Sequence, residues 1–165
     1  MKRAALLAAA LLLARLAAAG PELTFDVLAR TAYRTNPERA READSAYARA
    51  VEIGESGFKL GTAREFDAKL RRAAILGHVG AADLMCTMRS NAALGLVFFR
   101  EGYAWCRIAQ AYFRDTDEIG AQRVAEHLAF VILKLGKENL YLGRDYEQFT
   151  LRTMQEVAGD ATASH

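Results

Sequence analysis

The chain contains two cysteines, Cys86 and Cys106, which could form a disulfide bond. Position 96, midway between them, falls in a segment predicted to join two antiparallel helices, and residues equidistant from such a connection face each other. A disulfide requires Cα atoms within about 7 Å, and closing this loop would stabilise the fold by roughly 3 kcal/mol. We therefore predict a Cys86–Cys106 disulfide. The alternatives are two small buried thiols that never bridge, or a catalytic thiol, for which no histidine is predicted nearby.

The histidines offer no metal-binding pattern. His78, His127 and His165 are all separated from one another and from the cysteines by spacings other than the four residues that place two ligands on one helical face. We expect His78 in a turn, His127 at a helix surface or edge, and His165 in the C-terminal tail. The sequence therefore predicts no metal site and no cofactor.

One glutamate, Glu55, is a candidate general acid. The Glu-Ser-Gly-Phe sequence at 55–58 follows a predicted helix.

This short motif resembles the catalytic motif of soluble lytic transglycosylases. The resemblance implies peptidoglycan cleavage with Glu55 as general acid, a role that requires partial burial to raise its pKa. The segment Gly80–Met85 is also similar to a later segment of that family, but Cys86 stands where the family has glutamine and Phe113 where it has asparagine. We therefore interpret Glu55 as a solvated residue near a helix end, and keep the enzyme as the alternative.

The N-terminus has the order of charged, apolar and small residues that is typical of a signal peptide. A basic start is followed by an apolar run over residues 4–14 and by small residues at Ala17 and Ala19. This run is shorter than the roughly 20 residues of a membrane-spanning helix. We predict cleavage between Ala19 and Gly20, a periplasmic or secreted location, and no stable membrane insertion afterwards. An uncleaved amphipathic anchor, which Arg15 favours, is the alternative.

Removal of residues 1–19 changes the charge of the protein. Lys2, Arg3 and Arg15 leave with this segment, so the formal charge falls from +2 to −1 and the 165-residue chain shortens to 146 residues. A near-neutral chain with interleaved charges lacks the basic patch that phosphate neutralisation requires. We therefore exclude a nucleic-acid partner and expect one domain, over residues 20–158.

Apolar residues recur at helical spacing and strand-type alternation is nowhere sustained, which predicts an all-α protein of about seven helices. The expected helices lie near Phe25–Ala32, Asn36–Gly54, Thr62–Gly77, Gly80–Met88, Trp105–Tyr112, Val124–Leu135 and Arg144–Ala158.

Local signals predict how some of these helices begin and end. Asn36 is an expected N-cap before Pro37, and Thr62 with Glu65 has the spacing of a capping box. The apolar run Leu94–Phe99 is expected to be a buried loop or a short strand. Gly136 and Gly143 are expected breaks, and residues 159–165 are expected to be disordered.

A weak internal repeat is present. Arg-Ala-Ala at 72–74 recurs as Arg-Ile-Ala at 107–109, and Gly-Ala at 80–81 recurs at 120–121.

This pattern, over roughly residues 63–135, resembles the Sel-one-like repeats of the tetratricopeptide superfamily. The resemblance implies antiparallel helical hairpins stacked as a short solenoid, and an irregular bundle is the alternative. It divides the domain into an N-terminal pair (20–61), two repeat-like pairs (62–135) and a capping helix (137–158). Gly102, where the family usually has alanine, departs from the pattern.

The family implies binding of a protein or peptide without catalysis. We therefore expect an exported scaffold or adaptor of the cell envelope, whose partner and oligomeric state the sequence does not define. Tyr103 and Tyr112 are the candidate partner-binding residues, because aromatic side chains dominate interface energetics.

Overall fold

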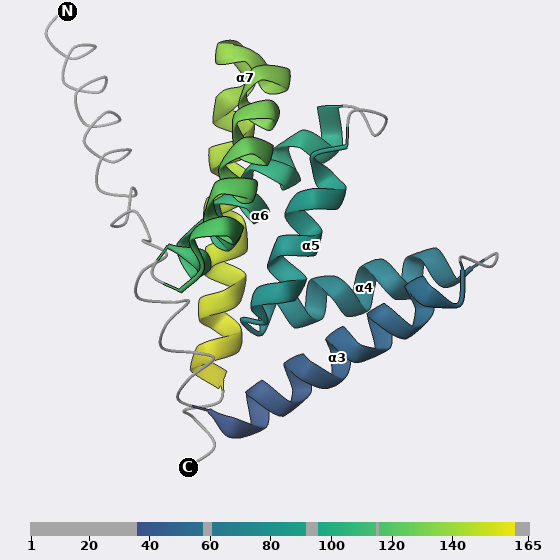
Figure 1. Cartoon of the computed structure of the whole chain (residues 1–165). Coiled ribbons are helices and arrows are strands. Elements are labelled where there is room, and N and C mark those ends of the chain that lie inside the picture. The colour runs from purple at the N-terminus through teal and green to yellow at the C-terminus, as the bar shows by residue number, and fades with distance from the viewer. Residues whose placement is uncertain (1–35, 58–60, 92–95, 115, 161–165) are drawn as a thin grey trace, which may run out of the picture.

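The computed structural model describes residues 36–57, 61–91, 96–114 and 116–160, and in these ranges it contains helices and no strand (Figure 1). Within the described ranges five helices follow one another: α3 (Pro37–Glu55), α4 (Thr62–Ile75), α5 (Val79–Arg89), α6 (Leu96–Phe113) and α7 (Glu118–Asp160). The prediction of an all-α protein is therefore confirmed, and the described part of the chain contains five helices where about seven were expected for the protein. The expected signal peptide and the expected helix at 25–32 lie outside the described residues.

Helix α3 begins where its sequence predicts. The side chain of Asn36 accepts hydrogen bonds from the backbone N–H groups of Glu38 and Arg39 at 3.0 and 3.1 Å, and Pro37 occupies the first helical position. This satisfies two of the N–H groups that a helix start leaves without an intrahelical partner. Small buried residues, including Ala43 and Ala50, then let α3 pack along α4.

Helix α4 begins differently from the prediction. Gly61 is the N-cap, with a φ of 97°, and it makes no side-chain cap. Thr62 is therefore already inside the first turn, one position too late for a capping box with Glu65. The carboxylate of Glu65 instead accepts from Arg49 of α3 at 3.1 Å.

The turn between α4 and α5 forms as predicted. Gly77 has a φ of 98°, and the N–H groups of Gly77 and His78 donate to the carbonyl oxygens of Ala74 and Ala73, both at 3.0 Å. These two bonds are a Schellman motif, which needs a residue that tolerates the left-handed conformation. His78 then caps α5, because its Nδ1 accepts from the N–H of Ala81 at 3.1 Å.

The expected loop or strand over Leu94–Phe99 is wrong from Leu96 onward, because α6 begins there; residues 94 and 95 lie outside the described ranges. Short apolar runs do not distinguish a strand from a buried helix, and α6 is covered on two sides, by α5 and by α7. Gly102 lies in this helix against α5. A Cβ atom there would be 2.9 Å from the carbonyl oxygen of Arg89, so the close approach of the two helices requires glycine at this position.

Helix α7 contains one of the two expected glycine breaks. Gly136 has non-helical φ and ψ of 71° and 165°, and the chain changes direction there, from the green to the yellow half of α7 in Figure 1. Gly143 does not interrupt the helix, because its missing side chain accommodates Tyr103 of α6. Gly159 and Asp160, expected in a disordered tail, are helical.

The core lies between these helices and contains the single tryptophan. Trp105, Leu70, Met85 and Leu151 are among the large side chains with at most 1 % exposure. None of the described helices combines the length and apolar character that a membrane span requires.

Candidate functional site

A groove of about 650 Å³ opens between α4 and the facing ends of α5 and α6. We call it the α4–α6 groove. Six residues of α4 between Ala63 and Arg71 line it, together with Met88 and Arg89 of α5 and Phe98 of α6. Most of its surface is apolar. Its volume falls within the range typical of ligand sites, roughly 300–1,000 Å³.

The base of the groove is a network of charged side chains in which Arg89 and Glu101 are largely buried and Asp67 and Arg71 are partly exposed. Arg89 forms an ion pair with Asp67 of α4, and its Nε lies 3.1 Å from a carboxylate oxygen of Glu101 of α6. The same oxygen of Glu101 accepts from Arg71 of α4 at 2.9 Å. Only 9 % of the Arg89 side chain and 13 % of the Glu101 side chain are exposed. We call these four residues, with Tyr146, the arginine network.

Tyr146 connects the network to α7. Its hydroxyl lies 2.5 Å from a guanidinium nitrogen of Arg71. Burial of Arg71 opposes its charged form, but the nearby Tyr146 and Glu101 outweigh this effect and raise its pKa above the ordinary arginine value. Arg71 therefore stays charged, and the network joins four helices around one pair of guanidinium groups.

Helical spacing places these groups at the groove. Asp67 and Arg71 are four residues apart, so they lie on one face of α4 and approach to 3.7 Å. Arg89 is the last residue of α5, and its guanidinium carbon lies 4.9 Å from the ring centre of Phe98, a cation–π arrangement. The aromatic wall of the groove is thereby held against its charged base.

Arg64 differs from the other two arginines of the groove. It is exposed, and within the described ranges it forms no ion pair or hydrogen bond. The carboxylates of Asp67 and Glu101 compensate Arg71 and Arg89. The third positive charge, that of Arg64, therefore faces solvent at the rim of an apolar surface.

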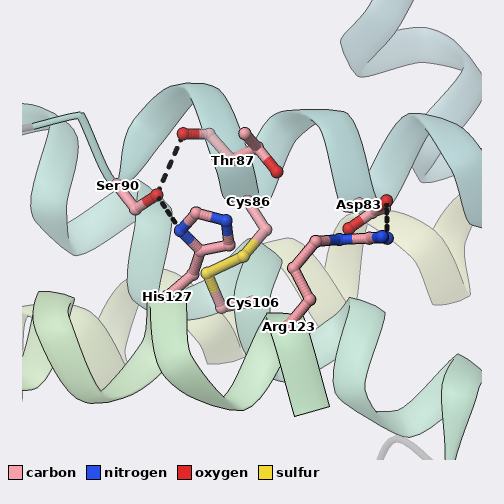
Figure 2. The surroundings of a disulfide bond; sticks show 7 residues. All are labelled: Asp83, Cys86, Thr87, Ser90, Cys106, Arg123 and His127. Atoms are coloured by element: carbon pink, nitrogen blue, oxygen red, sulfur yellow. Dashed lines mark hydrogen bonds and ion pairs between the residues drawn. A yellow bond between two sulfur atoms is a disulfide. The ribbon is translucent and has the colours of Figure 1, made fainter. Parts of the chain in front are cut away.

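The predicted cysteine pair is at disulfide distance in the structure. Cys86 of α5 and Cys106 of α6 are joined with Cα atoms 4.6 Å apart, and neither side chain is exposed (Figure 2). Cys86 lies one turn before Arg89 in α5. The disulfide therefore fixes the same pair of helices that supplies Met88, Arg89 and Phe98 to the groove.

A serine and a histidine lie beside this disulfide, as Figure 2 shows. The Ser90 hydroxyl is 3.0 Å from Nδ1 of His127 and 2.9 Å from the carbonyl oxygen of Thr87. The Ser90 hydroxyl has one proton and can donate to only one of these two groups. If it donates to the carbonyl oxygen of Thr87, then the Nδ1–H group of His127 donates to the Ser90 oxygen. With Ser90 only 5 % exposed, this arrangement is suited to capping the end of α5 and not to nucleophilic attack.

The candidate general acid lies elsewhere. Glu55 is the last residue of α3 and is exposed, and it is not among the residues that line the α4–α6 groove. Its neighbour Ser56 caps the helix through a hydrogen bond from its hydroxyl to the carbonyl oxygen of Ile53 at 3.0 Å. Cys86, which stands in the place of a polar residue of the enzyme family, is taken up by the disulfide.

The two tyrosines expected to bind a partner are not equivalent. Tyr103 is 8 % exposed and packs against Gly143, so its ring belongs to the core between α6 and α7. Tyr112 is partly buried near the end of α6. Neither of them lines the α4–α6 groove.

Of the histidines, His78 and His127 lie within the described ranges and His165 lies outside them. Among the described residues, no group of three histidine, cysteine or carboxylate side chains is placed to hold a metal ion. His78 stacks on Tyr47 with ring centres 4.1 Å apart. Its pKa is lowered by burial, an effect that Asp44 partly offsets.

Comparisons with known proteins do not assign this chain to a family. No known protein family, curated protein or solved structure matches this chain.

Sequence reasoning missed the α4–α6 groove and the arginine network. The spacing of Asp67 and Arg71 was a readable signal for an ion pair on one helix face. The contributions of Arg89, Glu101 and Tyr146 were not readable, because they depend on how three further helices cross α4.

Proposed function

We propose that this protein is an exported binding module of the cell envelope that performs no catalysis and takes a protein or peptide partner in the α4–α6 groove. The observation that carries the proposal is the groove itself, an open and mostly apolar surface above a base that is fixed by charge pairs and a disulfide. A preorganised surface of this kind reduces the ordering cost that a partner would otherwise incur on binding. Stacked helical hairpins, expected from the repeat resemblance, suit the same role.

The exposed position of Glu55 supports this reading over the peptidoglycan-cleaving alternative. A general acid in a glycosidase needs an environment that keeps it protonated, which is partial burial in a cleft. Clearing of a peptidoglycan suspension by the wild-type protein, lost on Glu55→Gln, would overturn the proposal.

Site-specific crosslinking in the native host tests the proposal directly. Ala68 is exposed and lines the groove, and Ala48 is exposed on α3 and does not. Each is replaced by the photo-crosslinking residue benzoylphenylalanine. We expect a discrete crosslinked protein from position 68 only, and the purified partner should bind wild type and lose affinity for Met88→Asp. Identical products from both positions, or none from position 68, would contradict a groove partner.

A further inference from the structure

We propose that the α4–α6 groove selects an acidic amphipathic helix, whose apolar face enters the groove and whose carboxylate pairs with Arg64. This inference rests on the proposed function and specifies the chemistry of the partner. Three observations lead to it: the charge at the rim, the length of the groove, and the nature of its walls.

The charge at the rim favours an acidic ligand. Three guanidinium groups line the groove, and the two that form its base are already paired with Asp67 and Glu101. Arg64 supplies the remaining positive charge. A carboxylate placed there gains a charge-assisted hydrogen bond, whereas an ammonium group would face a like charge.

The length of the groove suits a short helix. Its α4 wall runs from Ala63 to Arg71, which at about 1.5 Å per residue is roughly 12 Å, or just over two helical turns. Apolar side chains at i, i+3, i+4 and i+7 of a partner helix cover this distance.

The walls favour a helix over an extended peptide. An extended segment needs partners for its backbone N–H and C=O groups, and the described part of the chain offers no strand edge. A helix satisfies its own backbone. Phe66, Met88 and Phe98 supply aromatic and thioether surfaces, which adapt well to aliphatic side chains.

Two synthetic peptides test the proposal on the full mature protein. Each is an amphipathic helix of about 14 residues with one leucine face, and the flanking positions are either glutamates or lysines. Fluorescence anisotropy at low salt gives the affinity of each. We expect the glutamate peptide to bind roughly tenfold more tightly, and this preference to shrink as salt is added.

Variants assign the preference to its residue. Arg64→Glu should abolish or reverse it, while Arg41→Glu, at an exposed arginine of α3 outside the groove, should leave it unchanged. Both arginines are at the surface, so both variants should fold, and their circular dichroism spectra verify this. Met88→Gln should weaken both peptides by the same factor.

The outcomes separate this inference from the proposed function. Equal binding of the two peptides, weakened by Met88→Gln, would overturn the acidic partner and leave the groove as a binding site. Binding of neither peptide would overturn the helical ligand, while the crosslinking experiment decides the proposed function by itself. Saturable binding of decanoate that depends on Met88, with no peptide binding, would assign the groove to a fatty acid and contradict the inference.

Discussion

The substitution Glu101→Gln probes the arginine network most directly. One carboxylate oxygen of Glu101 accepts from Arg71 at 2.9 Å and lies 3.1 Å from Nε of Arg89. Glutamine has nearly the same shape but no charge. The variant therefore leaves both guanidinium groups with Asp67 as their remaining carboxylate, while the side chain of Arg89 stays 9 % exposed.

The expected loss follows from this geometry. A hydrogen bond to a charged group contributes about 1.5–3 kcal/mol, and removal of one partner from a buried ion pair costs about 3–5 kcal/mol. Glutamine keeps one acceptor oxygen and Arg89 keeps Asp67, so the lower end applies, about 3 kcal/mol. For a protein of this size, that free energy corresponds to a fall in Tm of roughly 6–12 °C.

Thermal and urea unfolding followed by circular dichroism measure the effect. The matched control is Glu52→Gln, which removes a carboxylate 2.8 Å from Arg49 in an ion pair exposed on both sides. Exposed pairs of this kind contribute little, so the control should keep the wild-type Tm. If Glu101→Gln also keeps it, the network is not a stabilising element and the reasoning fails.

Three further predictions follow from other contacts. The double variant Cys86→Ala/Cys106→Ala should lose roughly 3 kcal/mol of unfolding free energy in guanidinium titrations, because no disulfide then closes a loop between residues 20 positions apart in the unfolded chain. A loss below about 1 kcal/mol would contradict this prediction. Burial lowers the pKa of His78 below the ordinary 6.5, so the fold favours the neutral ring. The neutral ring therefore stabilises the fold fully above about pH 6.5, and this contribution is lost as the pH falls from 6.5 through the lower pKa of the folded state. Wild-type Tm should therefore fall more between about pH 7.5 and about pH 5 than that of His78→Asn, which keeps a cap for Ala81 but does not titrate, and parallel Tm profiles would contradict the assignment. Gly102→Ala should destabilise by about 1–3 kcal/mol in urea titrations, because its Cβ would lie 2.9 Å from the carbonyl oxygen of Arg89, whereas Gly54→Ala, with no contact shorter than 3.5 Å, should be neutral or stabilising.

Local chemistry made some of the fold predictable. The cap of α3 depends on Asn36 and Pro37, and the turn before α5 depends on Gly77 and His78. In each case the signal and its effect lie within a few residues. The cysteine pair was predicted correctly from a connection centred on position 96, although that position is the first residue of α6. Cys86 lies three residues before the end of α5 and Cys106 ten residues after the start of α6, so the pairing depends on how far α6 extends past α5 and not on equal distances from the connection.

The errors arose where tertiary contacts decide the outcome. Gly143 was expected to break a helix, but Tyr103 packs against it and the helix continues. The run Leu94–Phe99 was expected to be a loop or a strand, because its apolar character alone does not show that its described part, from Leu96, belongs to α6, a helix that packs against both α5 and α7. The groove depends on the meeting of three helices, which no single segment encodes.

Three features with different chemistry specify the contact between α5 and α6. Gly102 removes the side chain that would hold the helices apart, the Cys86–Cys106 disulfide holds them together, and the Arg89–Glu101 pair fixes them at the groove. Packing alone tolerates small shifts of one helix along another, whereas a covalent bond and a buried ion pair do not. Because α5 and α6 supply Met88 and Phe98, this triple constraint fixes the walls of the groove relative to each other, which is the preorganisation that the proposed binding role requires.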